Sequence, residues 1–301
     1  TALTEIAVSE GVASIGNYVF SECTALKSVT LPESLTSMGY GLIEDTAVES
    51  ITIPKNVAKC AYSSSNGTYA GPLSGCKSLK KVVFEEGMTA IPAYVCYCSS
   101  YLEQVVLPST IETIDGCSFC NCTRLKSISI PEGVQVIWNS AFAGCSGLGE
   151  LVIPKTVSTI GNYSFQNCSG INTVTIEENT KTGFKVEIGV YAFENCSGIE
   201  KLNMSKNVVS LGGRVFSGCT SLESFDMPEG IQSIGDYAFS GCTALTEIAV
   251  SEGVTSIGNY VFSGCRALTS VTLPETLTSM GYGLIEDTSV ESITIPKNVT
   301  K

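Results

Sequence analysis

Hydrophobic residues recur in one fixed frame along the whole chain. The stretch 222–244 reads LESFDMPEGIQSIGDYAFSGCTA, and the next 23 residues, 245–267, read LTEIAVSEGVTSIGNYVFSGCRA. The shared frame is L-x-x-I-x-I-P-x-x-V-x-x-I-G-x-x-A-F-x-x-C-x-x, in which the apolar positions keep their places while the residues between them vary. A period of this length is typical of a solenoid, in which each repeat packs mainly against its neighbours.

Each part of the frame predicts a local structure. The alternation L-x-x-I-x-I predicts a short strand with one buried face, and Pro at position 7 ends that strand because it cannot donate a backbone hydrogen bond. Val at position 10 and Ile at position 13 predict a second short inward segment, followed by a corner at the Gly of position 14. The spacing A-F-x-x-C predicts a single 3₁₀ or short α-helical turn.

The frame fits twelve complete repeats and a truncated thirteenth, or about 12.5 repeats. Two repeats are longer than the others, and their insertions lie at 60–71 and 177–188. We therefore predict a single solenoid domain over residues 1–301. The repeats begin at Leu3, Leu26, Val48, Leu79, Leu102, Leu125, Leu148, Ile171, Ile199, Leu222, Leu245, Leu268 and Val290.

A longer period overlies the short one. Residues 1–59 and 243–301 are identical at 52 of 59 positions, with an offset of 242 residues. This offset equals the summed length of the first ten repeats, so a ten-repeat cassette begins again at residue 243. Both ends of the sequence fall inside a repeat and neither shows a polar cap, which favours uncapped ends and a segment of a longer chain.

Composition excludes several classes of function. The net charge is −12 and no basic stripe is present, which argues against nucleic acid and anionic membranes as partners. No apolar run approaches about 18 residues, so no transmembrane helix is expected. The chain contains no histidine, which excludes Ser-His-Asp and Cys-His nucleophile systems and histidine-containing metal sites. We therefore predict no enzyme activity, no catalytic residue and no cofactor or cofactor-binding residue.

Nine of the fourteen cysteines occupy one position of the frame. A buried free cysteine behaves as a small apolar residue, so this column predicts reduced thiols in the core. By this count Asp45 and Asp287 replace the cysteine in the two short repeats, and Ser99 replaces it in another. The column consists of Cys23, Cys76, Cys122, Cys145, Cys168, Cys196, Cys219, Cys242 and Cys265.

The other five cysteines have less regular surroundings. Cys96 takes the phenylalanine position and is predicted to be core, whereas Cys60 opens the first insertion. Cys98, Cys117 and Cys120 fall in adjacent repeats and are predicted to lie nearer the surface. A thiolate metal site, a local disulfide and inert thiols all remain open for these three residues.

The frame resembles the BspA-like leucine-rich repeat family, as the stretches 125–131 (LKSISIP) and 234–242 (IGDYAFSGC) illustrate. The resemblance implies an α/β but β-dominated leucine-rich-repeat solenoid, right-handed, with parallel short strands and 3₁₀ or short helical turns. It also implies a bacterial or protist protein, at the cell surface or secreted, that adheres to a protein or glycan ligand on a host or neighbouring cell. The family offers no catalytic residues to carry over.

Three surfaces are candidates for such binding. The first insertion supplies Tyr62, Ser64, Asn66 and Tyr69, the residue types that antibody loops use for contact area and adaptable hydrogen bonds. The outward strand positions supply a mildly apolar patch whose members are Val83, Val106 and Val152. A tyrosine stripe at position 16 could stack on sugars, and it consists of Tyr18, Tyr94, Tyr163, Tyr191, Tyr237 and Tyr260.

Each candidate surface has a plainer interpretation: a tolerated insertion, a solvated strand face, or a half-buried wedge of tyrosines. The leading hypothesis is a non-catalytic adhesion or protein-interaction module. The alternatives are a structural spacer and a carbohydrate-binding solenoid.

Overall fold

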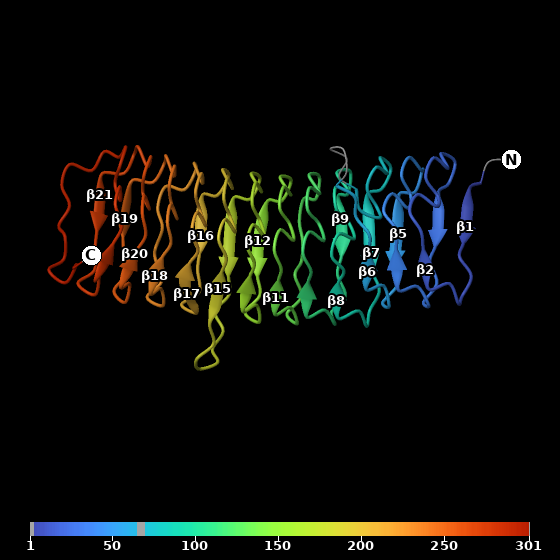
Figure 1. Cartoon of the computed structure of the whole chain (residues 1–301), viewed down its shortest axis with the longest axis horizontal. Helices are drawn as coiled ribbons and strands as arrows, with labels where there is room; N and C mark the ends of the chain where they lie inside the picture. Colours follow the sequence, from blue (N-terminus) through green and yellow to red (C-terminus); the bar gives the residue numbers. More distant parts are fainter. Residues whose placement is uncertain (1–2, 65–69, 301) are drawn as a thin grey trace. The chain divides into compact units, whose positions relative to one another are not determined.

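The computed structural model describes residues 3–64 and 70–300, and the chain divides into two compact halves, residues 1–148 and 149–301. Within each half the repeats stack side by side (Figure 1). Each complete repeat supplies up to two short strands, one at frame positions 3–6 and one at positions 12–13. All of the strand pairs are parallel, and no described residue lies in a helix. The β-dominated solenoid predicted from the period is confirmed.

In the first half, the strands at positions 3–6 pair in the orders β1-β3 and β5-β7-β9, and those at positions 12–13 in the orders β2-β4-β6 and β8-β10-β11. Their bounds are β1 Glu5–Ala7, β2 Ser14–Ile15, β3 Ser28–Thr30, β4 Ser37–Met38, β5 Ser50–Ile53, β6 Lys59–Cys60, β7 Lys81–Phe84, β8 Ala90–Ile91, β9 Gln104–Val106, β10 Thr113–Ile114 and β11 Val136–Ile137.

In the second half, the corresponding orders are β12-β14-β16 and β19-β21 on one side, and β13-β15-β17-β18-β20-β22 on the other. Their bounds are β12 Glu150–Ile153, β13 Thr159–Ile160, β14 Thr173–Ile176, β15 Val186–Ile188, β16 Lys201–Asn203, β17 Val208–Leu211, β18 Ser233–Ile234, β19 Glu247–Ala249, β20 Ser256–Ile257, β21 Ser270–Thr272 and β22 Ser279–Met280.

The register aligns equal frame positions of neighbouring repeats. In β5 and β7, Ile51 stands opposite Val82 and both are buried, while the outward Ser50 stands opposite Lys81. This is the alternation that the sequence predicts. Among the complete repeats, the strand at positions 3–6 is missing in two, at 127–130 and 224–227, and it is also missing at 292–295 in the truncated last repeat.

The sequence predicts a 3₁₀ or short α-helical turn between the second strand and the next repeat, and this prediction is wrong. Residues at positions 16 and 20 have positive φ, as at Tyr237 (57°) and Gly241 (74°), and a helix cannot pass through such residues. The backbone N–H groups of positions 16, 18 and 20 instead donate to carbonyls of the following repeat. Phe239 N, for example, donates to Val261 O at 2.9 Å. The turns therefore form a third ladder alongside the two sets of strands.

The core contains a column of stacked phenylalanines from position 18. Ring centroids of Phe193 and Phe216 lie 5.5 Å apart, and those of Phe216 and Phe239 lie 5.6 Å apart. These three rings are fully buried. Offset-stacked aromatic pairs stabilise a core beyond the area that they bury.

The cysteine column lies beside the phenylalanines, and its members are buried except for the half-buried Cys23. All fourteen cysteines of the chain are free thiols. Column thiols donate to the phenylalanine carbonyl of the preceding repeat: Cys145 Sγ lies 3.0 Å from Phe119 O, and Cys265 Sγ lies 3.1 Å from Phe239 O. A weak S–H donor in an apolar slot thus gains an acceptor, which alanine could not use.

One residue assignment in the column was wrong. In the 22-residue repeats Thr46, not Asp45, fills the cysteine slot, because the missing residue comes after this slot rather than before it. Thr46 is 5% exposed and its Oγ1 lies 3.4 Å from Cys76 Sγ. Asp45 has positive φ, is exposed, and pairs with Lys77 at 3.1 Å. The assignment of Asp287 is wrong for the same reason. Asp287 has positive φ, and the hydroxyl of Thr288 donates to Ile285 O at 2.8 Å.

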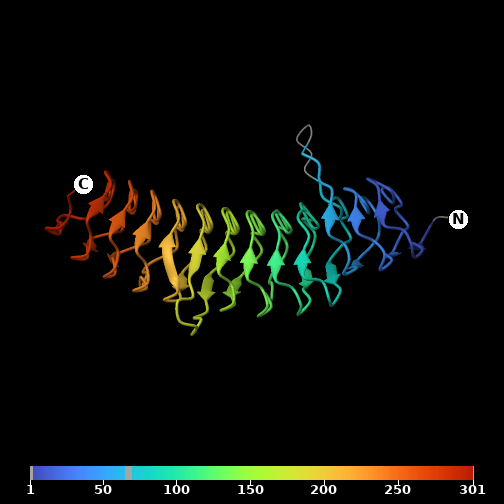
Figure 2. The same cartoon turned by 60° about the horizontal axis from the view of Figure 1, so that its bottom comes forward.

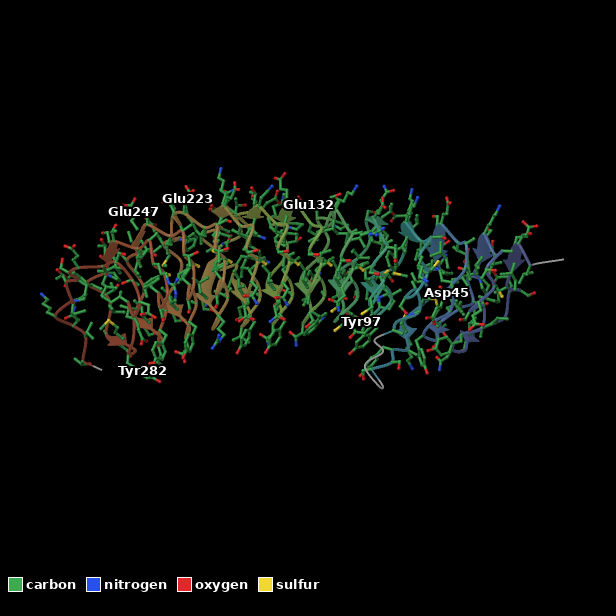
Figure 3. All side chains as sticks on the ribbon, turned by 90° about the horizontal axis from the view of Figure 1, so that it is seen from above. Asp45, Tyr97, Glu132, Glu223, Glu247 and Tyr282 are labelled. Carbon is green, nitrogen blue, oxygen red and sulfur yellow. The ribbon has the colours of Figure 1, made fainter. Side chains whose placement is uncertain are left out.

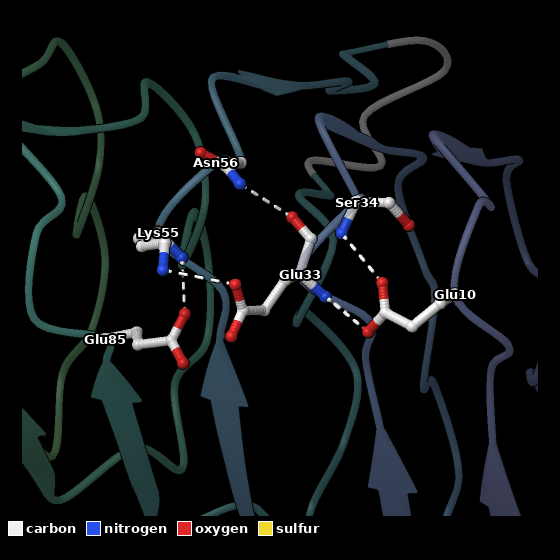
Figure 4. Close-up of polar contacts among 6 residues, drawn as sticks. All are labelled: Glu10, Glu33, Ser34, Lys55, Asn56 and Glu85. Carbon is white, nitrogen blue, oxygen red and sulfur yellow. Dashed lines mark hydrogen bonds and ion pairs between the residues drawn. The ribbon is translucent and has the colours of Figure 1, made fainter.

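Carboxylates and amides connect the corners of neighbouring repeats (Figure 4). Glu10 Oε1 accepts the backbone N–H of Glu33 at 3.1 Å, and Asn56 Nδ2 donates to Glu33 O at 2.8 Å. The duplicated segment reproduces the second bond, because Asn298 Nδ2 donates to Glu275 O at 2.8 Å. Part of the acidic composition therefore serves to bind backbone N–H groups at corners.

Both insertions are tied to the stack. The chain leaves the stack after β6 (Figure 2), and Ser63 and Ala70 pair as an antiparallel bridge. In the second insertion Asn179 Nδ2 donates to Lys155 O at 2.7 Å, while the backbone N–H of Asn179 donates to Asn207 Oδ1 at 2.8 Å. The last three residues assigned to this insertion form β15, so the part that lies outside the ladder is shorter than predicted.

Candidate functional site

Three tyrosines gather at the base of the first insertion. The rings of Tyr62 and Tyr94 are stacked, with centroids 3.9 Å apart and planes 11° apart. Tyr97 meets both rings edge-on, at 6.5 Å from Tyr62 and 5.6 Å from Tyr94. Tyr62 is nevertheless 48% exposed, so the cluster offers aromatic surface to solvent. We call Tyr62, Tyr94 and Tyr97 the tyrosine cluster.

The backbone at the end of the insertion holds this cluster in place. Gly71 N donates to Tyr97 O at 3.3 Å. A Cβ at Gly71 would lie 2.3 Å from the carbonyl oxygen of Tyr94, so only glycine allows this close approach. Of the other predicted insertion residues, Ser64 is exposed. Asn66 and Tyr69 lie outside the described residues.

A group of cysteines borders the tyrosine cluster. Cys117 lies beside Cys120, Ser140 and Tyr94, each of which lowers its pKa. Hydrogen bonding to Cys120 is the main cause and takes the pKa of Cys117 from 9.0 to about 7, against the opposing effect of burial. The same interaction raises the pKa of Cys120.

The third member of this group is Cys98. Its sulfur accepts a hydrogen bond from Asn121 Nδ2 at 3.6 Å, and burial raises its pKa. Sulfur atoms lie beside the labelled Tyr97 in Figure 3. Across residues 3–64 and 70–300, no three His, Cys, Asp or Glu side chains are arranged to hold a metal ion.

The predicted valine patch is divided between the two halves. Val83 and Val106 are direct neighbours in the register of β7 and β9, and Val106 is 38% exposed. Val152 lies in the second half, opposite Thr175, and is 40% exposed. The structure therefore brings the first two valines together and places the third in a separate set of strands.

Shallow grooves run over the outward strand positions in each half. One of about 380 Å³ crosses β3 and β5, between Ser28 and Glu85. One of about 400 Å³ crosses the missing strand at 224–227 and reaches β21. Serine, threonine and carboxylate side chains line both together with apolar residues such as Phe225 and Ile51. Both grooves are shallow, so neither resembles the enclosed apolar pockets that bind small molecules.

Comparison with known proteins identifies the repeat. The family description "BspA type leucine rich repeat region" matches in six copies, over residues 1–122, 89–184 and 186–301. The chain belongs to the BspA-type leucine-rich repeat family. No curated protein matches this chain.

Solved structures of leucine-rich repeat proteins are similar to this chain to different degrees. A leucine-rich repeat protein from Bacteroides ovatus is 26% identical, with a TM-score of 0.68 over 91% of this chain and 79% of that one. A leucine-rich cell surface protein from Faecalibacterium prausnitzii is 24% identical, with a TM-score of 0.45 over 90% and 88% of the two chains. The pneumococcal vaccine antigen PcpA is 18% identical, with a TM-score of 0.49 over 99% and 83%.

In this BspA-type chain the tyrosine stripe forms a stacked ladder over residues 163–260, which we call the tyrosine ladder, whereas Tyr18 meets Tyr40 edge-on and Tyr94 stacks on Tyr62. In the second half, ring centroids lie 4.7 Å apart for Tyr163 and Tyr191, and 5.0 Å apart for Tyr237 and Tyr260. The guanidinium of Arg214 stands between the pairs, 5.9 Å from the ring of Tyr191 and 4.3 Å from that of Tyr237. Neighbours therefore stand over both ring faces of Tyr191 and Tyr237, which leaves little free ring face for a ligand there.

Sequence reasoning missed two residues of these surfaces. Tyr97 occupies position 19, where its ring completes the tyrosine cluster, and Arg214 occupies position 16, where it continues the tyrosine ladder. Their frame positions could have indicated these contacts, because side chains at the same frame position of neighbouring repeats stack on one another. The contact of Tyr62 with Tyr94 had no such signal, since Tyr62 belongs to an insertion outside the frame.

Leucine-rich repeat solenoids are generally non-enzymatic. Among the residues that the structure describes, there is no helix of sufficient length and apolar character to cross a membrane.

Proposed function

We propose that the chain is a non-catalytic protein-interaction module that binds an adhesion ligand through the tyrosine cluster and the adjoining insertion. The observation that supports this site is the gathering of Tyr62, Tyr94 and Tyr97 around a 48% exposed ring. Tyrosine supplies large contact area at a low cost in side-chain entropy, and it is enriched among residues that dominate binding energies.

The mutual packing of the three rings adds to the argument. Tyr62 is held against Tyr94 before any ligand arrives, so binding would immobilise little further side-chain freedom. The strand faces offer small hydroxyl and valine side chains and shallow polar grooves. Such a face suits a broad, weak contact more than a localised strong one.

We also propose that the protein acts at the cell surface or after secretion, as the resemblance to surface repeat proteins implies. Its partner would be a protein or a glycan of a host or neighbouring cell. The stacked faces of the tyrosine ladder argue against sugar stacking there, whereas the strand face at Val83 and Val106 remains the competing protein-binding surface.

The test is an array of matrix proteins and glycans probed with the purified chain and three variants. Tyr62→Ala removes the exposed ring. Tyr282→Ala is the matched control, because this tyrosine is 67% exposed and belongs to the second half, which does not contain the first insertion. Val106→Glu disturbs the strand face. Circular dichroism and thermal melting establish that each variant is folded.

We expect binding to a protein ligand that Tyr62→Ala weakens at least tenfold and that the other two variants retain. Unchanged binding by Tyr62→Ala with loss in Val106→Glu would transfer the site to the strand face. Binding confined to glycans would support the carbohydrate alternative. Absence of binding to any probe would favour a structural spacer and contradict the proposal.

A further inference from the structure

Cys117 and Cys120 stand at the two ends of one tight turn. The backbone N–H of Cys120 donates to Cys117 O at 3.3 Å, which closes a β-turn. The first and last Cα atoms of a β-turn lie within about 7 Å, and disulfides join Cα atoms about 4.4–6.8 Å apart. The backbone therefore already has the span of a disulfide.

The side chains also leave the turn toward each other. In the preceding repeat Tyr94 and Tyr97 occupy the same two positions, 16 and 19, and their rings are in contact at 5.6 Å. In the repeat of interest the two thiols are close enough for each to shift the pKa of the other. Both are half-buried, so a small reagent in solvent can reach them.

The surroundings distinguish the two sulfurs. Cys117 lies beside Cys120, Ser140 and Tyr94, all of which stabilise a thiolate at this position. Cys120 retains its proton, because its interaction with the Cys117 thiolate, burial and the repulsion of a second negative charge all raise its pKa. Cys117 is thus the nucleophile, and Cys120 is the neighbouring thiol that can attack it in a second step.

Most of the remaining cysteines are either buried or have a raised pKa. Column thiols such as Cys145 and Cys219 are buried and donate to carbonyls, and burial raises their pKa well above 9.0. Cys265 has a lowered pKa through its interaction with Cys242, but it is fully buried and closed to reagents. Cys98 is half-buried, but its pKa is also raised. Reactivity of cysteine follows thiolate content and access, so it should concentrate at Cys117.

We propose that Cys117 and Cys120 form a thiol–disulfide exchange site that accepts small-molecule disulfides from the surroundings. The Cys117 thiolate attacks one sulfur of the disulfide, forms a mixed disulfide with it, and expels the other sulfur as a thiolate, which takes up a proton. Cys120 then loses its proton, attacks Cys117 Sγ, and expels the second small thiol. The protein dithiol is oxidised by two electrons to a disulfide, and the small disulfide is reduced to two thiols.

The experiment treats the reduced, folded chain with oxidised glutathione and measures released glutathione together with mass-mapped cysteine peptides. We expect two glutathione molecules released per chain, and a peptide containing Cys117 and Cys120 that has lost two hydrogens. In brief alkylation near neutral pH, Cys117 should react roughly five to ten times faster than an exposed thiol with the ordinary pKa, because its larger thiolate fraction outweighs its lower intrinsic nucleophilicity.

Three serine variants assign the steps. Cys120→Ser should accumulate glutathione on Cys117, Cys117→Ser should abolish the fast reaction, and Cys98→Ser should leave it unchanged. Alkylation of the unmodified chain gives an answer that does not depend on how the variants fold. Equal labelling of Cys98, Cys117 and Cys120, or undiminished glutathione release by Cys117→Ser, would overturn the proposal.

Discussion

The two halves of the duplication offer a reciprocal test of backbone strain in the turn ladder. Glu22 and Gly264 occupy the same place in the two copies, at position 20 of the frame. Both have positive φ, 62° for the glutamate and 76° for the glycine. Exchanging the residues therefore changes the side chain while the required backbone conformation stays the same.

The structure allows the magnitude to be worked out. A non-glycine residue in the left-handed region costs about 1–2 kcal/mol, and glycine loses about 0.5–1 kcal/mol more chain entropy on folding than alanine does. Glu22→Gly should therefore stabilise its turn by roughly 0.5–1 kcal/mol, and Gly264→Glu should destabilise its turn by a similar amount. A Cβ at Gly264 would lie 3.6 Å from Gly241, an ordinary contact, so steric overlap does not contribute.

The assay is hydrogen exchange followed by mass spectrometry, because repeat arrays need not unfold in one step. Protection over residues 16–26 should rise about two- to fivefold in Glu22→Gly, and protection over 258–268 should fall by a similar factor in Gly264→Glu. Glu112→Gly is the control, since this residue does not have positive φ and should lose protection. Shifts of the same sign in Glu22→Gly and Gly264→Glu would refute the strain argument.

Three further predictions follow from packing and protonation. The stretches 48–57 and 290–299 have the identical sequence VESITIPKNV, but only the first forms a strand, so its amides should exchange more slowly; equal rates would contradict the packing described. Phe142→Ala should lower the free energy of unfolding by about 3–5 kcal/mol, and Cys145→Ala by less, as measured by chemical denaturation; a larger loss at the cysteine would be inconsistent with its role as a small filler. The folded pKa of Cys117 is depressed to about 7 from 9.0. The Cys117 thiolate therefore contributes fully to the free energy of unfolding above pH 9.0, and this contribution is lost as the pH falls through 7. Denaturation curves should therefore show the stability difference between wild type and Cys117→Ser growing from about pH 7 to about pH 9, and a decreasing difference would reverse the sign assigned here.

The period carried most of the information about the fold. Inward residues such as Leu125, Ile137 and Phe142 are all buried, because stacking equal positions leaves each of them facing a neighbour of its own kind. The same logic correctly predicted burial for most of the cysteine column. Asp45 was assigned wrongly, because counting from Leu26 places Thr46 at position 21 and Asp45 at position 20, where positive φ recurs.

Features that depend on backbone conformation could not be predicted from the apolar pattern. The spacing A-F-x-x-C suits a helix, and only the positive φ at positions such as Tyr237 shows why the chain turns instead. The tyrosine cluster was equally hidden, because Tyr62 reaches Tyr94 from an insertion with no counterpart in other repeats. The predicted role of Tyr62 in ligand binding stays a prediction.

The corner bond that recurs from Asn56 to Glu33 and from Asn298 to Glu275 has a consequence for how such a gene can change. Each bond joins a repeat only to the one beside it, so a cassette contains the residues that make its own inter-repeat hydrogen bonds wherever it is inserted. Unequal recombination between near-identical DNA copies could then lengthen or shorten the protein by whole cassettes without disturbing any contact inside them. Repeat number would become a heritable variable that selection can adjust separately from the sequence of any repeat.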